Sequence, residues 1–380
     1  MHVLLVEPAY YTRFPPLGLL KLSSYHKARG HTVELVRGLR QPEMPPDLIC
    51  VTSLFTYSWS PVHEVVSRYR SLFPRARVQV GGIYASLMPE HAGSTGAEIH
   101  TGLLPEAEDF APDYSLVPSW DASILFSSRG CVRRCAFCSV PKIEPDFHCQ
   151  PSIAGLVEPA HRRIVLWDNN FLASPFAPDI LDELADMGKT VDFNQGLDAR
   201  LLTPALAEKL ARVRQRLLRI AYDTPGEGKV AQRAIEYLAE AGISKKKIVV
   251  YVLFNFRDSP DDFLRRIHDL MSWDVTAYPM RFEPLNSLKK NQHVGSKWTA
   301  EQLEMIADAR RVLGWAGAWP PTEGLKRKFL EARSFENAMS LREKARPQLA
   351  AKPSINSATR AAQRRHPSSV LESAAGGGAV

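Results

Sequence analysis

The chain has few cysteines and no long apolar run, and both shortages limit the classes of protein to which it can belong. Five cysteines in 380 residues are too few for the disulfide framework of a secreted domain. No apolar stretch approaches the roughly 18 residues that cross a bilayer, and the first residues lack the pattern of a signal peptide. We therefore expect a cytoplasmic protein that does not work in a membrane.

Two further absences limit the ligands and partners. No Gly-x-Gly-x-x-Gly turn occurs, so a dinucleotide site is not indicated. The net charge of +7 is not spread along the chain, because residues 325–380 hold eleven Lys or Arg and four Glu, which already amounts to +7. We expect the tail at 347–380 to be basic and disordered. Nucleic-acid binding through this tail is left open but is not favoured.

The composition is that of a globular protein with room for two cores. Apolar residues make up 45% and charged residues 23% of the chain. Short apolar strands alternate with helices in the first hundred residues. Strands are expected at 2–6, 32–36, 48–54, 77–80 and 98–102, and helices at 15–29 and 61–72. This pattern predicts a doubly wound, Rossmann-like α/β domain at 1–102, and the proline-rich residues 103–122 are expected to form a linker.

A second strand–helix alternation follows the linker. Strands are expected at 124–126, 163–167, 191–194, 217–222, 247–254 and 277–282, and helices at 178–187, 203–213, 229–241 and 260–272. Six such units predict a partial (β/α)6 barrel over residues 123–298, with its active site at the carboxyl ends of the strands. C-terminal helices are expected within 299–346, at 299–313 and 323–346.

Three of the five cysteines stand together directly after the first barrel strand. The run SRGCVRRCAFC places Cys131, Cys135 and Cys138 at C-x3-C-x2-C spacing. Three such thiolates can hold three corners of a cubic iron–sulfur cluster, and no fourth cysteine follows at ligand spacing, so one iron would remain open for chemistry. A structural zinc site is the alternative, with His148 or Cys149 as the fourth ligand, although such sites usually take their ligands in two pairs.

This motif, with Phe137 before its last cysteine, resembles the signature of the radical S-adenosylmethionine (radical SAM) enzymes. The segments PPLGLLKLSSYHKARGH and VGGIYASLMPEH resemble the cobalamin-binding-type domain that precedes the barrel in one class of these enzymes. The resemblance covers most of the chain. It implies one [4Fe-4S] cluster, S-adenosylmethionine and an electron donor such as flavodoxin or ferredoxin. Cobalamin is left open, because the Asp-x-His-x-x-Gly motif that holds cobalt in many such domains is absent.

The resemblance also implies a reaction and residues for it. S-adenosylmethionine would chelate the open iron and be cleaved by one electron to methionine and a 5′-deoxyadenosyl radical. Asp168, Asn169 and Asn170 end the second barrel strand, where the resemblance implies an acceptor for the methionine amino group; which of the three makes contact is left open. Arg200 offers a two-pronged donor for the methionine carboxylate, or is a surface arginine.

Further residues at strand ends are candidates for contacts with substrate or ribose, or for satisfied polar groups at the barrel rim. These are Tyr222, Asp223, Asn255, Arg281 and Glu283. Arg133 and Arg134 lie between the cysteines and would ease reduction of a cluster, or else face a reductase or solvent. Phe137 and Trp167 are placed near the cluster or the adenine, or in the core.

Three functions fit these observations. The first is a radical SAM enzyme that abstracts hydrogen from an unidentified small-molecule or macromolecular substrate. The second is a cobalamin-dependent radical SAM methyltransferase. The third, of another class, is a non-catalytic iron–sulfur redox sensor or RNA-binding protein. Only Cys50 and Cys149 remain outside the motif, so a single cluster is predicted.

Overall fold

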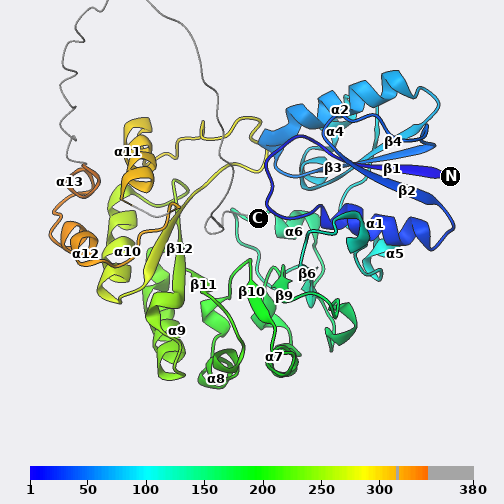
Figure 1. Cartoon of the computed structure of the whole chain (residues 1–380). Helices are drawn as coiled ribbons and strands as arrows, with labels where there is room; N and C mark the ends of the chain where they lie inside the picture. The colour runs from blue at the N-terminus through cyan, green and yellow to red at the C-terminus, as the bar shows by residue number, and fades with distance from the viewer. Residues whose placement is uncertain (314–315, 341–380) are drawn as a thin grey trace, which may run out of the picture.

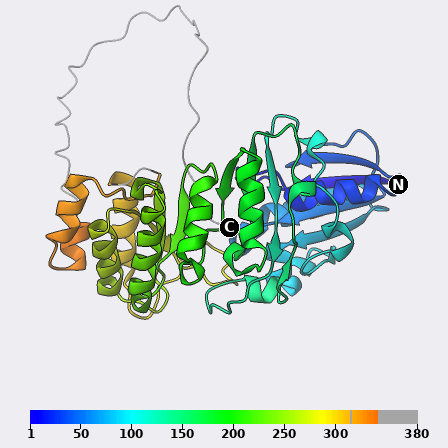
Figure 2. The ribbon, with the colours of Figure 1, turned by 90° about the horizontal axis from the view of Figure 1, so that it is seen from below.

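The computed structural model describes residues 1–313 and 316–340, so the tail predicted at 347–380 lies outside the described residues. Two parallel-sheet domains lie side by side (Figures 1 and 2), the N-terminal one in blue and the barrel in green and yellow. The C-terminal helices lie at the end of the barrel that is remote from the N-terminal domain. In the described part of the chain, no helix has the length and apolar character needed to cross a membrane.

The N-terminal domain is a five-stranded parallel sheet in the order β2-β1-β3-β4-β5. Its strands are β1 (His2–Glu7), β2 (Thr32–Arg37), β3 (Leu48–Ser53), β4 (Arg77–Gly82) and β5 (Glu98–Ile99). Helix α1 (Leu17–Lys27) covers one face, and α2 (Trp59–Leu72), α3 (Ile83–Leu87) and α4 (Pro89–Gly93) cover the other. The middle residues of β1 and β3 form continuous apolar runs because their alternate side chains enter the cores on both faces. The predicted doubly wound domain is confirmed.

The segment before the barrel is packed along α1. It contains α5 (Pro105–Glu108) and a 3-10 turn at Tyr114–Leu116. The carboxylate of Asp113 accepts a hydrogen bond from Ser23 Oγ at 2.6 Å and pairs with Lys27 Nζ at 2.6 Å. These contacts hold the segment against the N-terminal domain, so it does not span the two domains as a loose connection.

The barrel consists of six parallel strands in two hydrogen-bonded groups. Strands β6 (Ala122–Leu125), β9 (Arg163–Leu166) and β10 (Thr190–Phe193) form the first group, and β11 (Leu218–Ala221), β12 (Ile248–Phe254) and β13 (Thr276–Arg281) the second. Isolated parallel bridges from Val191 to Gln215 and from Leu197 to Ile220 connect β10 with β11. Helices α7 (Ala177–Asp186), α8 (Pro204–Arg212), α9 (Gly228–Glu240) and α10 (Pro260–Ser272) alternate with the strands. The predicted partial barrel is confirmed.

The C-terminal helices extend the barrel core. They are α11 (Ala300–Val312), α12 (Glu323–Leu330) and α13 (Phe335–Met339). The prediction of one helix over 323–346 is wrong for its middle, and its end from residue 341 lies outside the described residues. The backbone leaves the helix after Leu330, and Ser334 caps a new one by accepting the N–H of Asn337 at 3.1 Å. The break allows Phe335 to enter the core, where it is 1% exposed.

The domains are joined by contacts on two sides. Near β6, the ring of Phe14 packs edge-on against Trp167 with centroids 5.3 Å apart. On the other side, the loop at 282–298 reaches back from the barrel to the N-terminal domain (Figure 1), where Trp59 Nε1 donates to the Leu288 carbonyl at 3.2 Å. The N-terminal sheet is therefore fixed beside the mouth of the barrel.

Candidate cluster and cofactor site

The cysteine loop begins two residues after β6, at the carboxyl end of the barrel strands. Its base is a short antiparallel pair, β7 (Ser128–Arg129) with β8 (His148–Cys149), and α6 (Val140–Ile143) lies between them in sequence. The pairing places the backbone of Cys149 opposite Ser128. The chemistry-bearing loop is thus anchored at both ends, in the position where barrels of this kind carry their active sites.

The three cysteines of the motif are free and half-buried. Backbone N–H groups point at two of the sulfurs: Arg133 N lies 3.3 Å from Cys131 Sγ, and Val140 N lies 3.5 Å from Cys138 Sγ. Burial raises the pKa of the Cys138 thiol, and also that of Cys135 despite the nearby positive charge of Arg200. Hydrogen bonds to sulfur are a feature of iron–sulfur sites, so this donor set suits such a cluster.

The sulfurs are not drawn together as a finished metal site. Among residues 1–313 and 316–340, no three His, Cys, Asp or Glu side chains are grouped closely enough to hold a metal ion. This finding applies equally to a cluster on the three cysteines and to a zinc site that adds His148 or Cys149. The choice between an iron–sulfur cluster and zinc rests on the donor set. That set is three thiols in one loop, with backbone N–H groups directed at two of the sulfurs.

The sequence analysis missed Glu144, which fastens the loop just before its first cysteine. Its carboxylate accepts the N–H of Gly130 at 2.8 Å and the amide of Asn169 at 3.0 Å, and it pairs with Arg129 at 3.1 Å. Gly130 has φ +73°, and a Cβ at this position would overlap the carbonyl oxygen of Asp146. Glycine is required there because the returning chain crosses directly over it.

Asp168 stands behind the cysteine loop. It is 2% exposed and accepts hydrogen bonds from Ser127 N at 3.1 Å, Ser127 Oγ at 2.5 Å and Ser128 Oγ at 2.7 Å. Burial raises its pKa, although these hydrogen bonds oppose the rise. Both carboxylate oxygens therefore hold the start of the loop, and a role for Asp168 as a cofactor acceptor stays a prediction.

Asn170 has the free acceptor that the strand-end cluster was expected to supply. Its Nδ2 donates to Asp198 Oδ2 at 3.1 Å and lies 3.6 Å from Cys131 Sγ. Its Oδ1 is buried without a hydrogen-bond partner, which is costly unless a ligand supplies a donor. Asn169 instead donates to Glu144 and supports the loop. Asp168, Asn169 and Asn170 therefore have different hydrogen-bond partners, although the sequence analysis assigned them the same candidate role.

Arg200 shares Asp198 with Arg133. Arg200 donates to the two oxygens of Asp198 at 2.7 and 3.2 Å, and Arg133 Nε approaches one of them at 3.1 Å. Burial works against the ionised carboxylate, but these hydrogen bonds hold the pKa of Asp198 below its usual value. Both predicted arginines thus meet beside the cysteines, where Asp198 orients them. Arg134 is exposed.

The residues predicted at the ends of β11 and β12 do not all face the mouth. Tyr222 is 2% exposed and donates its hydroxyl to Asp269 of α10 at 2.9 Å, so it belongs to the core. Asn255 is also buried and binds the loop at 282–298 through His293 O at 3.0 Å and Gly295 N at 2.7 Å. For these two residues the barrel-rim interpretation is the one that the contacts support.

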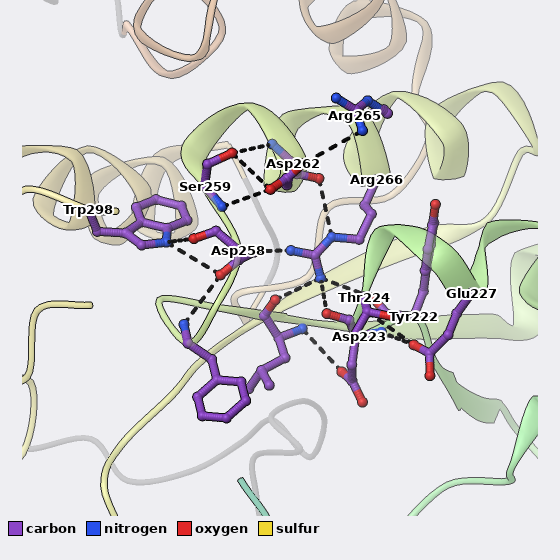
Figure 3. A network of polar contacts seen from close by, with 12 residues as sticks. Tyr222, Asp223, Thr224, Glu227, Asp258, Ser259, Asp262, Arg265, Arg266 and Trp298 are labelled. Carbon is purple, nitrogen blue, oxygen red and sulfur yellow. Dashed lines mark hydrogen bonds and ion pairs between the residues drawn. The ribbon is translucent and has the colours of Figure 1, made fainter. Parts of the chain in front are cut away.

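Asp223 remains at the mouth because a buried arginine holds the chain around it. Its carboxylate accepts the N–H of Leu253 at 3.3 Å, and burial together with the charge of Glu227 raises its pKa to about 6. Figure 3 shows Arg266 reaching from α10 to the ends of β11 and β12. Its guanidinium donates to the carbonyls of Asp223 and Leu253 at 2.7 Å each and pairs with Asp258.

The two aromatic residues predicted near the cluster lie in different surroundings. Phe137 packs edge-on against Phe256 with centroids 5.7 Å apart, and Phe256 lies 4.7 Å from Phe282. Trp167 instead packs between Phe14 and Phe126, at the contact between the domains. Phe137 therefore begins a row of rings along the mouth, whereas Trp167 belongs to the inter-domain core.

A cavity of about 340 Å³ lies between the cysteine loop and the N-terminal sheet. Its walls include Thr52 and Gly81, at the carboxyl ends of β3 and β4, and Lys21 on α1. Arg129 and Glu144 of the cysteine loop close the opposite side. Doubly wound domains bind their ligands at this edge of the sheet, so the cavity connects the binding edge of one domain with the cysteine loop of the other.

Comparison with solved structures finds the same two-domain fold in the radical S-adenosylmethionine methyltransferase TsrM from Kitasatospora setae. The structure described with cobalamin and a [4Fe-4S] cluster bound has 17% identity and a TM-score of 0.58, and the match covers 83% of this chain and 79% of that one. The structure described with tryptophan substrate and the SAM analogue aza-SAM has 16% identity and a TM-score of 0.58, over 83% of this chain and 77% of that one.

Comparisons with protein-family models and with curated proteins give no match. The structural match spans both domains, and it confirms that the chain has the fold of a radical SAM enzyme with an N-terminal cobalamin-binding-type domain. At 17% identity the likeness concerns the fold. The chemistry must therefore be argued from the residues of this chain.

Proposed function

We propose that the chain is a radical SAM enzyme, and that it is a methyltransferase that uses cobalamin. The observation that carries the proposal is the joint cavity, which opens at the ligand-binding edge of the N-terminal sheet and is closed by Arg129 and Glu144 of the cysteine loop. A cofactor bound at that edge would lie beside the cluster loop. The fold of TsrM, described with both cobalamin and a [4Fe-4S] cluster, supports the same pairing.

The residues at the barrel mouth suit a cluster with one open iron. In this proposal Cys131, Cys135 and Cys138 bind three irons, and Glu144 keeps the start of the loop in place. A [4Fe-4S] cluster so held supplies one electron to S-adenosylmethionine bound at its open iron. The unpartnered Oδ1 of Asn170 accepts a hydrogen from the ammonium group of that ligand.

The cavity fits part of a cobalamin molecule. Its floor includes Gly81 and Gly82 at the end of β4. Gly82 lets the Ser53 backbone pack against it, because a Cβ there would lie 2.2 Å from the Ser53 carbonyl oxygen. A volume of about 340 Å³ lies in the range of small-ligand sites, so Lys21, Thr52 and the other lining residues would hold a part of cobalamin. No histidine of the Asp-x-His-x-x-Gly type is present, so the proposed binding mode uses no such ligand to cobalt.

A second candidate is hydrogen abstraction without cobalamin. It is favoured by the ion pairs already present around the cavity, because Glu108 pairs with Lys21 at 3.1 Å and with Arg129 at 3.6 Å. Burial lowers the pKa of Lys21 even though the negative charge of Glu108 opposes this shift. Charged residues that already have ion-pair partners in the cavity wall gain less from a bound ligand than unpaired charges would.

Anaerobic reconstitution of the full chain tests the proposal. Iron, sulfide and cobalamin are quantified, and the products of S-adenosylmethionine are analysed in the reduced sample. We expect about four irons and four sulfides per chain, stoichiometric cobalamin, and cleavage or methyl transfer. Full cleavage without cobalamin would favour the second candidate. Zinc without sulfide would refute both, and a cluster with no turnover of S-adenosylmethionine would favour a redox sensor or RNA-binding protein.

Two matched cysteine variants sharpen this experiment. Cys135→Ser removes a proposed iron ligand and should reduce the iron content to that of the protein before reconstitution. Cys149→Ala lies outside the motif and should leave the iron content unchanged, because a single cluster needs no fourth thiolate. Equal iron content in the two variants would contradict the assignment of the ligands.

A further inference from the structure

A second cavity of about 490 Å³ lies at the open edge of the barrel, between the end of β13 and α11. Phe254, Leu303 and Ile306 form an apolar wall, and all three are at most 2% exposed. Arg281, at the carboxyl end of β13, and Arg310, on α11, also line the cavity. Its volume is in the range of small-molecule sites.

Each of the two arginines has an unused donor beside this cavity. The Nε atoms of Arg281 and Arg310 are both buried without a hydrogen-bond partner. Among the residues that the structure describes, Arg281 donates through Nη2 alone, to the carbonyls of Asn291 at 3.0 Å and His293 at 2.9 Å. These carbonyls are neutral, so they accept hydrogen bonds from the Arg281 guanidinium without balancing its positive charge. Buried N–H groups of a guanidinium are costly unless an acceptor reaches them.

Arg310 is likewise directed by neutral groups. Its Nη2 donates to the hydroxyl of Tyr278 at 3.3 Å, and its guanidinium lies 5.2 Å from the centre of that ring. Gly317 has φ +83°, and a Cβ there would approach Arg310 Nη2 to 2.6 Å, so the glycine leaves room for the guanidinium. In the described part of the chain, neither Arg310 nor Arg281 forms an ion pair. Glu304 is the single acid among the described lining residues, and it is exposed.

One residue of the cavity wall, Arg281, is next in sequence to a row of aromatic rings at the mouth of the barrel. Phe282 follows Arg281 directly and belongs to the row of rings that begins at Phe137, beside the last cysteine. Phe282 also packs edge-on against His293, with centroids 5.3 Å apart, and the carbonyl of His293 binds Arg281. The aromatic row therefore leads from the cysteine loop to Phe282, the residue that follows Arg281.

We propose that this cavity binds the anionic end of the substrate, and that the substrate is an organic acid with a carboxylate or phosphate on an apolar body. The planar forks of Arg281 and Arg310 match either anion, and Phe254 with Leu303 contacts the apolar body. The assignment of the ligand as substrate rests on the proposed function. The assignment of an organic-anion site stands on the cavity alone.

The test is ligand binding to the full chain without its cluster. Binding does not require enzymatic activity, so the result can be interpreted even if the proposed function is wrong. Calorimetric titrations use benzoate, phenyl phosphate, benzamide and inorganic phosphate. We expect benzoate or phenyl phosphate to bind, the better of the two identifying the anion, and benzamide to bind at least tenfold more weakly because it has no charge. Equal binding of benzamide, or binding of inorganic phosphate as tight as that of the best organic anion, would overturn the proposal.

Substitutions locate the site. Arg310→Gln should weaken binding of the better anion by about tenfold or more, and Arg281→Gln should do the same. Arg265→Gln is the matched control, because Arg265 is an exposed arginine on α10 whose ion-pair partner is Asp262, and it should bind like the unmodified chain. If Arg281→Gln fails to fold, Arg310→Gln still decides, since within residues 1–313 and 316–340 the Arg310 side chain donates to the Tyr278 hydroxyl and to no backbone group. Unchanged affinity in Arg310→Gln would exclude this cavity.

Discussion

Replacing Arg266 with Met should strongly destabilise the barrel. The Arg266 side chain is fully buried at 0% exposure, and it joins the carbonyls of Tyr222, Asp223 and Leu253 to the carboxylate of Asp258 (Figure 3). Methionine fills similar volume but leaves three carbonyls without this donor and one buried carboxylate without its cation.

The size of the effect follows from what is left behind. Removing one partner of a buried ion pair costs about 3–5 kcal/mol, chiefly because the other charge remains buried. Asp258 keeps hydrogen bonds from Phe256 N at 3.2 Å and Trp298 Nε1 at 3.3 Å, which solvate part of its charge. We therefore expect Arg266→Met to lower the free energy of unfolding by about 4 kcal/mol, a third or more of the stability of many domains.

Urea unfolding followed by circular dichroism measures this loss. The double variant Arg266→Met/Asp258→Asn should recover at least about 1 kcal/mol relative to Arg266→Met, because the uncompensated charge is gone. Arg265→Gln, on the neighbouring exposed position, should stay within about 0.5 kcal/mol of the unmodified chain. A loss below about 1 kcal/mol in Arg266→Met, or no recovery in the double variant, would refute the reasoning.

Three further predictions concern pH, the cluster loop and the ligand. Burial, with the charges of nearby His31 and Arg29, lowers the pKa of His26 to about 4. The unfolded chain therefore binds a proton there from about pH 6.5 downward while the folded chain does not. Stability should fall by about 2 kcal/mol between pH 6.5 and 4, less than the full shift implies because solvent screens part of the effect. Urea unfolding across this range should show a shallower slope in His26→Gln, and an equal slope would contradict the assignment. Gly130→Ala should contain little iron after reconstitution. Gly155→Ala is the control, because a Cβ there meets nothing within 4 Å, and it should contain as much iron as the unmodified chain. Similar iron contents in the two variants would contradict the role of Gly130 in the loop. Asn170→Ala should raise the Kd for S-adenosylmethionine about tenfold at unchanged iron content, and a Kd within twofold of normal would show that its Oδ1 is not the acceptor.

The sequence was informative wherever a signal is local. Apolar runs such as that of β3 located the strands, because a strand buried on both faces cannot contain many polar residues. The spacing of Cys131, Cys135 and Cys138 placed three thiols in one loop without reference to the rest of the chain. Because parallel strands all end at one edge of a sheet, the sequence also indicated that Asp223 and the cysteine loop lie at the same mouth.

Tertiary structure decided which of these side chains are available to a ligand. Asp168 and Asn170 are two residues apart, yet Ser127 and Ser128 occupy the first while the second keeps an unpartnered oxygen. Tyr222 looked equivalent to its neighbour but enters the core. Whether a side chain is available to a ligand depends on hydrogen-bond partners that are distant in sequence. The periodicity of the sequence does not reveal those partners.

By itself the sequence determined the two-domain α/β fold and the position of the thiol loop, because both follow from short-range patterns of apolar residues and ligand spacing. Only the tertiary structure decided that Glu144 and Asp198 organise the surroundings of that loop, and that Arg281 and Arg310 meet at one cavity. Those four charged side chains gain their roles from burial and from the groups they face. Both properties exist only once segments far apart in the chain have packed together.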